Sequence, residues 1–302
     1  MKIVFMGTPD FAVASLNALV EANFNVVAVV TAADKPAGRG QKLNESAVKK
    51  YAVEKGIPVL QPEKLKNPEF LAELKSYNAD LQVVVAFRML PEVVWAMPEK
   101  GTINLHGSLL PQYRGAAPIN HAIINGEKES GVTTFFLTHE IDTGDIIQSA
   151  SVEITNDETA GDLHDKLMNV GADLLVKTVT AIAEGNYKEQ PQPQSDVLKH
   201  APKIFKEDCK IDWNKTSEEV FNLIRGLSPY PTAFTLLNDK TLKVFKAEVE
   251  EKESAIVAGG FLTDGKTYLK FATKDGFIKL LDIQYEGKKR MLIEDFLRGM
   301  RL

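Results

Sequence analysis

The chain opens with the stretch K-I-V-F-M-G-T-P-D-F, from Lys2 to Phe11, and its pattern already indicates the class of fold. A short, mostly apolar run leads into a glycine, and a Thr-Pro-Asp turn then begins a segment with apolar residues at helical spacing. A short apolar run followed directly by a helical pattern is typical of a strand that passes into a helix in an α/β protein. The opening therefore predicts a strand over 2–6 and a helix over 11–20.

The same alternation repeats along the first part of the chain. Helical spacing predicts helices over 45–55, 68–77, 91–97 and 159–184. Runs rich in Val and Ile predict strands over 25–31, 80–87, 102–106, 132–138 and 146–154. Strands that alternate with helices form parallel sheets through right-handed crossovers. The expected fold class is therefore α/β, with a Rossmann-like, mostly parallel sheet and helices on both faces.

The pattern changes after residue 184. The segment 185–203 has three prolines and little apolar content, which is typical of a linker. Beyond a helical pattern over 217–227, short strand patterns follow over 233–237, 242–248, 255–263, 268–272 and 277–283. Short strands at this spacing predict a small β-barrel, similar in strand number to an oligonucleotide-binding (OB) barrel. We therefore expect an α/β domain over 1–184, a linker over 185–203 and an OB-like domain over 204–302.

Composition excludes several classes of protein. The 302 residues carry a net charge of −5, so a nucleic-acid coat over the whole surface is not expected, although a local basic patch is compatible with this charge. The single cysteine, Cys209, allows neither an intramolecular disulfide nor a zinc site built on cysteines. No run of 18 apolar residues occurs, so we expect no membrane span and a protein of the reducing cytoplasm.

Two polar motifs stand where an α/β sheet would place a ligand. Asn104 and His106 end one predicted strand and project from the same face of it, because they are two residues apart. A pair of satisfied polar residues is the alternative explanation. The segment Asp142-Thr143-Gly144-Asp145 is either a simple turn or the source of a carboxylate that orients His106. The α/β pattern and the lack of a second Asp-Thr-Gly motif exclude an aspartic protease.

Two loops narrow the choice of ligand. The turn at Gly7 carries a single glycine instead of G-x-G-x-x-G, which disfavours a nicotinamide-dependent dehydrogenase. The loop D-K-P-A-G-R-G-Q-K carries three basic residues, Lys35, Arg39 and Lys42. Such a loop is either solvated or a contact for a phosphodiester backbone, because phosphates dominate the binding of nucleic acids.

Several segments together resemble one family. They are F-M-G-T-P-D-F (5–11), K-P-A-G-R-G (35–40), N-L-H-G-S-L-L-P-Q-Y-R-G-A-A-P (104–118) and E-I-D-T-G-D (140–145), with I-D-W (211–213) and R-G-L-S-P-Y-P (225–231) further on. Over essentially its whole length the chain resembles the methionyl-tRNA formyltransferases, enzymes that use 10-formyltetrahydrofolate. The Asn-x-His segment with the downstream Asp-Thr-Gly-Asp is specific to folate formyltransferases, and the K-P-A-G-R-G loop narrows the resemblance to the tRNA enzymes.

The resemblance implies a reaction and a set of site residues. The formyl group of 10-formyltetrahydrofolate would pass to the α-amine of initiator methionyl-tRNA for translation initiation, in a monomer that needs no metal. The implied catalytic residues are Asn104, His106 and Asp142. The implied folate contacts are Ser108, Leu109, Leu110, Pro111, Phe87, Met89 and Leu90, and the implied tRNA contacts are Lys35, Arg39 and Lys42. Arg88 departs from the family's pattern in the folate-lining stretch.

The chemistry of these side chains agrees with the resemblance. Attack of an amine on the formyl carbon places negative charge on the formyl oxygen, and the amide of Asn104 can donate a hydrogen bond to it. A protonated His106 can donate a second one, a form that a neighbouring carboxylate favours. Asp142, directly or through a water, is the candidate base for the proton of the amine.

Two other functions compete with this one. The nearest alternative is a folate formyltransferase that acts on a nucleotide-sugar amine, which the loop around Arg39 disfavours. A tRNA-binding module without catalysis would require a broken catalytic trio, whereas all three residues are present.

Overall fold

The computed structural model describes residues 1–37, 42–194, 197–251 and 256–299. They form two compact units. The N-terminal unit contains 1–115, 131–152 and 164–199, and the C-terminal unit contains 116–130, 153–163 and the chain from 200 onward. Each unit is thus built from segments that are separated in sequence. The boundaries expected at residues 184 and 203 stay a prediction about independently folding domains.

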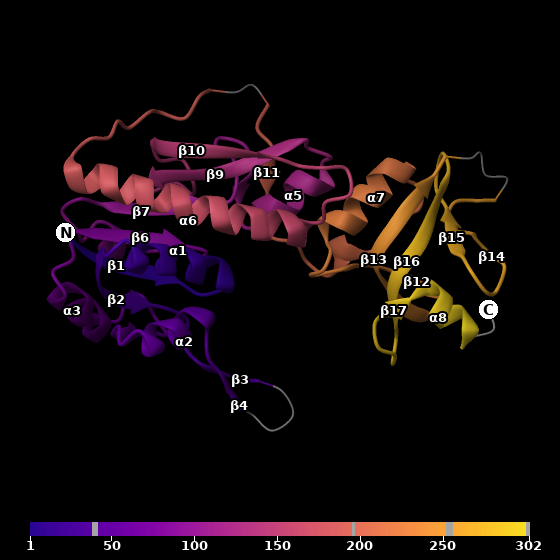
Figure 1. Cartoon of the computed structure of the whole chain (residues 1–302), viewed down its shortest axis with the longest axis horizontal. Coiled ribbons are helices and arrows are strands. Elements are labelled where there is room, and N and C mark those ends of the chain that lie inside the picture. Colours follow the sequence, from indigo (N-terminus) through magenta and orange to yellow (C-terminus); the bar gives the residue numbers. More distant parts are fainter. Residues whose placement is uncertain (38–41, 195–196, 252–255, 300–302) are drawn as a thin grey trace. The chain divides into compact units, whose positions relative to one another are not determined.

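The N-terminal unit is built on a seven-stranded sheet (Figure 1). Its spatial order is β10 (Ile146–Glu153), β9 (Glu129–Phe136), β7 (Thr102–His106), β6 (Leu81–Val85), β1 (Lys2–Gly7), β2 (Asn25–Val30) and β5 (Val59–Leu60). From β7 to β5 all neighbours are parallel, whereas β9 runs antiparallel to β7. The mostly parallel α/β sheet predicted from the sequence is confirmed.

Helices cover both faces of this sheet. They are α1 (Asp10–Glu21), α2 (Ala47–Glu54), α3 (Pro68–Ser76), α4 (Glu92–Trp95) and α6 (Ala160–Glu184). On one face, Val4 and Val84 join a core with Phe70 of α3. On the other face, Gly171 of α6 packs against Leu105, where an added Cβ would lie 3.0 Å from a leucine methyl. Every residue of β6 is buried, as expected for a strand that is covered on both sides.

The C-terminal unit holds an antiparallel sheet and further α-helices (Figure 1). The strands are β12 (Ala233–Leu237), β13 (Lys240–Glu250), β14 (Phe261–Thr263), β15 (Leu269–Ala272), β16 (Phe277–Tyr285) and β17 (Met291–Leu292). The helices are α5 (Pro118–Ile124), α7 (Ser217–Gly226) and α8 (Ile293–Arg298). Trp213 stacks on Phe271 in the core at 4.6 Å between ring centroids. The small antiparallel domain predicted after the linker is therefore confirmed.

One strand of this unit is shorter than predicted. The pattern over 255–263 predicts a long strand, but pairing begins only at Phe261. Gly259 adopts a φ of +84°, a backbone conformation that a strand does not contain. The glycine pair at 259–260 therefore forms a turn before the strand, and residue 255 lies outside the described part of the chain.

Arg225 fixes a loop within the C-terminal unit. It is only 4% exposed, and its Nε donates to Asn222 Oδ1 at 2.8 Å. Its Nη1 donates to the carbonyls of Glu158 at 2.9 Å and Thr155 at 3.4 Å. Burial lowers the pKa of the guanidinium below its ordinary value, because desolvation penalises the charged form. Backbone carbonyls thus compensate the buried charge and hold the loop in place.

None of the helices in the described ranges is both long enough and apolar enough to cross a lipid bilayer.

Candidate functional site

Strand β7 places Asn104 and His106 at the carboxyl edge of the parallel sheet. Val84 of β6 lies opposite Asn104 in the register, so Asn104 shares the sheet face that α3 and α4 cover. Its side chain is half-buried, and within the described residues its amide forms no hydrogen bond. Amides are normally bonded when they are removed from water. The amide of Asn104 is therefore available to a ligand at this edge.

The imidazole of His106 is buried and oriented from one side. Its Nε2 lies 2.9 Å from the carbonyl oxygen of Tyr113, so this nitrogen carries a proton and donates it. In the neutral ring the other nitrogen, Nδ1, then has a free lone pair. Nδ1 lies 3.8 Å from Asp142 Oδ2, beyond hydrogen-bond length but close enough for a charge interaction when the ring is protonated.

The Asp-Thr-Gly-Asp segment after β9 presents the carboxylate of Asp142 to this imidazole. Asp142 adopts a φ of +55°, which Asp and Asn tolerate better than most residues. Its Oδ2 accepts a hydrogen bond from the backbone N–H of Gly115 at 3.0 Å. At Gly144 a Cβ would lie 1.7 Å from the carbonyl oxygen of Phe136, so only glycine fits. The turn is therefore built to hold one carboxylate in one place.

The structure thus brings two members of the predicted trio together. His106 and Asp142 are both nearly buried, at 8% and 12% side-chain exposure, although 36 residues separate them in the sequence. Asn104 lies two residues before His106 on the same face of β7.

The first predicted folate-lining segment is a packed loop. Ser108 is fully buried, and its hydroxyl donates to the carbonyl of Gln112 at 2.7 Å. The hydroxyl of Thr133 donates to the carbonyl of Ser108, also at 2.7 Å. Leu110 and Pro111 are buried, whereas Leu109 is half-buried. Leu109 is therefore the more accessible apolar side chain of this loop, and Ser108 maintains the loop's shape.

The second predicted segment follows β6 and mixes core and surface residues. Leu90 belongs to the buried core on the face of α3 and α4, and Phe87 packs against that core while half-buried. Met89 is 77% exposed. An exposed, flexible thioether two residues from the half-buried Phe87 is suited to contact with an apolar ligand.

Arg88, which departs from the family's pattern, has a local structural explanation. Its guanidinium donates to the backbone carbonyls of Pro62 and Glu63 and lies 5.6 Å from the ring centroid of Phe87. Arg88 therefore links the loop after β6 to the loop after β5 and restrains Phe87 from the solvent side.

Two of the three predicted tRNA contacts, Lys35 and Lys42, lie on the strands of a β-hairpin. Lys35 is exposed and begins β3 (Lys35–Ala37), which pairs with β4 (Lys42–Asn44) in antiparallel register. Arg39 lies outside the described residues, as does the side chain of Lys42. The roles of all three residues stay predictions.

The base of this hairpin is held by a polar network. Lys49 forms an ion pair with Asp34 and a second one with Glu45 at 2.8 Å. Gln61 Nε2 donates to the other carboxylate oxygen of Asp34 at 2.7 Å. The hydrogen bond from Lys49, with that from Gln61, lowers the pKa of Asp34. Asp34 is therefore ionised near neutral pH and fixes the start of the hairpin.

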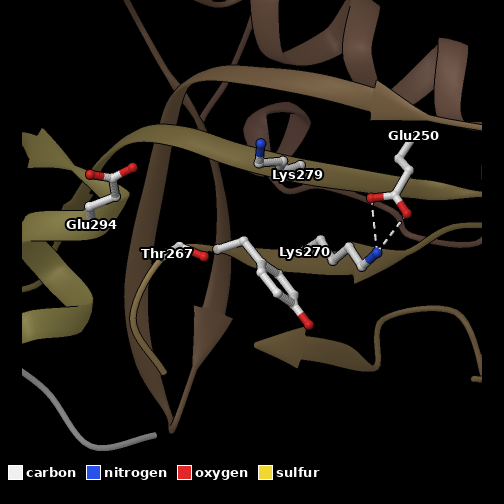
Figure 2. Close-up of a pocket in the computed structure, with 6 residues that line it drawn as sticks. Glu250, Thr267, Lys270, Lys279 and Glu294 are labelled. Carbon is white, nitrogen blue, oxygen red and sulfur yellow. Dashed lines mark hydrogen bonds and ion pairs between the residues drawn. The ribbon is translucent and has the colours of Figure 1, made fainter. Parts of the chain in front are cut away.

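A cavity of about 400 Å³ lies on the C-terminal unit (Figure 2). Its lining residues are Glu250, Thr267, Tyr268, Lys270, Lys279 and Glu294. Lys270 Nζ donates to both carboxylate oxygens of Glu250, at 2.7 and 2.8 Å (Figure 2). None of the residues predicted for the site lines this cavity. Because carboxylates accompany its lysines, its charge gives no preference for an anion.

Comparisons with known proteins identify the family. The family model described as "Formyl transferase" matches residues 1–179, and the model "Formyl transferase, C-terminal domain" matches residues 203–301. The chain is 53% identical to the methionyl-tRNA formyltransferase of Bacteroides fragilis, over all of this chain and 96% of that protein. It belongs to the methionyl-tRNA formyltransferase family. The family member of Azobacteroides pseudotrichonymphae is 55% identical, over 99% of this chain and 95% of that protein.

Solved structures extend the family's fold to other formyltransferases. A sugar 3N-formyl transferase, solved in the presence of dTDP and 5-N-formyl-THF, superimposes with a TM-score of 0.69 at 24% identity, covering 96% of this chain and 99% of that one. An N-formyltransferase from Helicobacter canadensis, in complex with folinic acid and dTDP-3-aminofucose, gives a TM-score of 0.68 at 24% identity, with coverages of 93% and 98%. At this identity the likeness shows the shared fold alone.

The sequence did not reveal the groups that hold His106 and Asp142 in place. The carbonyl of Tyr113, the N–H of Gly115 and the side chain of Gln192 all act here, and two of them are backbone groups without a residue signature. Gln192 lies in the segment that composition identifies only as a linker. No periodic pattern could have indicated it.

Proposed function

We propose that the protein transfers the formyl group of 10-formyltetrahydrofolate to the α-amine of initiator methionyl-tRNA, releasing tetrahydrofolate. Relatives more than half identical over nearly their whole length are methionyl-tRNA formyltransferases. The single structural observation that carries the proposal is the buried His106–Asp142 pair. His106 lies on β7 two residues after Asn104, whose amide has no partner within the described residues. These are the groups that acyl transfer to an amine requires.

We assign the roles of the trio from this geometry. Asn104 Nδ2 would donate to the formyl oxygen as negative charge develops there. His106 Nε2 is already bonded to Tyr113, so only a protonated Nδ1 could serve as a second donor. Asp142, at 3.8 Å from Nδ1, would stabilise that proton or accept the one released by the amine. Removing one donor of this kind from an acyl-transfer site typically costs ~3 kcal/mol of barrier.

The two substrates would lie against different segments. The apolar side chains of Leu109 and Met89 would contact the folate, with Leu110, Pro111, Phe87, Leu90 and Ser108 shaping the surface beneath it. The basic residues Lys35, Arg39 and Lys42 would contact the phosphates of the tRNA, and the C-terminal OB-like domain would contribute to holding the tRNA. The protein would act as a monomer in the cytoplasm, without a metal.

The direct test compares two acceptors. Purified protein is incubated with 10-formyltetrahydrofolate and either charged initiator methionyl-tRNA or a nucleotide-linked amino sugar, and the formylated product is measured by mass spectrometry. We expect formylmethionyl-tRNA with the first acceptor and no product with the second. Formylation of the sugar alone would overturn the proposal and support a sugar formyltransferase.

A further inference from the structure

The segment expected to be a linker is attached to the N-terminal unit near the candidate site. Gln190 and Ile146 exchange backbone hydrogen bonds of 2.8 and 2.9 Å at the start of β10. Further along, the carbonyl of Lys199 accepts from the N–H of Tyr113 at 2.6 Å. The N–H of Lys199 in turn donates to Gln112 Oε1 at 2.8 Å. Gln192 therefore lies in a stretch that is held on both sides.

The side chain of Gln192 contacts the turn that carries Asp142. Its Nε2 donates to the backbone carbonyls of Asp142 at 2.8 Å and Gly144 at 2.9 Å. Its Oε1 accepts from Arg114, from Nε at 3.1 Å and from Nη2 at 2.5 Å. A reversed amide would set oxygen against two carbonyls and NH₂ against a guanidinium, so these contacts determine its orientation.

These contacts link Asp142, Gln192 and the pair 114–115 into one network of hydrogen bonds. Arg114 is followed directly by Gly115, whose N–H donates to Asp142 Oδ2. The backbone of Asp142 and its carboxylate are therefore both tied to the pair 114–115, one through Gln192 and the other directly. Because Asp142 adopts a positive φ, its backbone conformation needs such support.

We propose that Gln192 is a positioning residue for Asp142, an inference that rests on the proposed role of Asp142 in formyl transfer. The amide of Gln192 holds the turn at 142–144 so that the carboxylate faces His106 Nδ1. A displacement of the carboxylate by about 1 Å is enough to slow a reaction by roughly a hundredfold, so loss of this amide affects turnover more than substrate binding.

The test uses Gln192→Met, which preserves the length of the side chain without its hydrogen bonds. Gln194→Met is the matched control, since Gln194 is exposed two residues further on. Formylation of methionyl-tRNA is followed for both variants, in the wild-type background and with Asp142→Asn. We expect Gln192→Met to lower kcat at least tenfold, with the KM values for folate and tRNA unchanged within twofold, and Gln194→Met to match wild type. In the Asp142→Asn background, Gln192→Met should cause no further loss.

Three outcomes separate the possibilities. A wild-type rate for Gln192→Met overturns the inference, and so does an equal loss in both backgrounds, because that indicates a general structural effect. A wild-type rate for Asp142→Asn itself overturns the proposed role of Asp142. Should Gln192→Met fail to fold, Gln192→Glu takes its place, since it still accepts from Arg114 but, when ionised, cannot donate to the two carbonyls. The same loss of kcat is expected for it, and a wild-type rate would overturn the inference.

Discussion

The edge of β7 in the N-terminal unit and the loop around Arg225 in the C-terminal unit both remove polar side chains from water, but they do so differently. Arg225 donates to two backbone carbonyls and to one side-chain oxygen, and is 4% exposed. At β7 the amide of Asn104 has no partner in the described structure, and His106 and Asp142 lie 3.8 Å apart without a direct hydrogen bond. The guanidinium of Arg225 is hydrogen-bonded within the protein, whereas at β7 the amide of Asn104 and Nδ1 of His106 can still form hydrogen bonds with a ligand.

This difference distinguishes polar groups that stabilise the fold from polar groups that can take part in the reaction. A satisfied buried group contributes to folding, because removing it leaves its partners unpaired at about 1–3 kcal/mol each. A group with unused capacity contributes little to folding and can bind a reacting atom. Substitutions at the edge of β7 should therefore change the rate of formylation but not the stability of the fold. Substitutions around Arg225 should change the stability of the fold but not the rate.

The largest effect is expected from Asp142→Asn. Asn keeps the size of Asp and tolerates the φ of +55°, but it cannot accept a proton at neutral pH. Single-turnover formylation should slow about a thousandfold, the range for loss of an acid–base group, with tRNA affinity nearly unchanged. A rate within threefold of wild type would remove Asp142 from the reaction.

Asn104→Ala should lower kcat by roughly a hundredfold or more through loss of one donor to the formyl oxygen. Because the amide of Asn104 has no partner within the described residues, the midpoint of thermal unfolding should stay within about 2 °C of wild type. A large loss of stability in Asn104→Ala with an unchanged kcat would contradict this contrast, because it would give Asn104 a structural role and no catalytic one.

Arg225→Met should lower the free energy of unfolding in urea by about 2–3 kcal/mol, since it removes the buried hydrogen bonds to Asn222 Oδ1 and to the carbonyls of Thr155 and Glu158. The formylation rate per folded molecule should stay within twofold. Arg298→Met is the control, because that side chain is 72% exposed, and it should change stability by less than about 0.5 kcal/mol. Equal effects of both variants would contradict the role of burial.

The smallest effect concerns Asp275, whose carboxylate accepts from the N–H of Ser217 at the start of α7 at 2.7 Å. This hydrogen bond lowers its pKa in the folded state. The ionised form therefore stabilises the fold above the ordinary pKa of Asp, and this stability is lost as the pH falls through the lowered value. Asp275→Asn should cost on the order of 0.5 kcal/mol at pH 7 and nothing in strong acid. Urea denaturation of both proteins between strong acid and pH 7 measures this cost. An equal loss of stability in strong acid and at pH 7 would contradict the prediction.

Much of the fold could be predicted because apolar residues recur at regular spacing along its longer helices and strands. The strand over 102–106 was predicted at its observed bounds, and the alternation along it places Asn104 and His106 on one face. The two-residue strand β5 and the hairpin β3–β4 were missed, since such short elements lack a period long enough to recognise. The sequence alone left Asp142 as a turn or a partner of His106, and the resemblance decided between them. Contacts such as Gln192 to Asp142, 50 residues apart, leave no local pattern.

We propose above that Asn104, His106 and Asp142 act together on one formyl group at the edge of β7. A crystal structure of the protein with 5-formyltetrahydrofolate, a stable analogue of the donor, tests it most directly. We expect the pterin to lie against Leu109 and Met89, with the formyl oxygen about 3 Å from Asn104 Nδ2. A formyl group bound away from this edge, with Asn104 and His106 both out of reach, would contradict it.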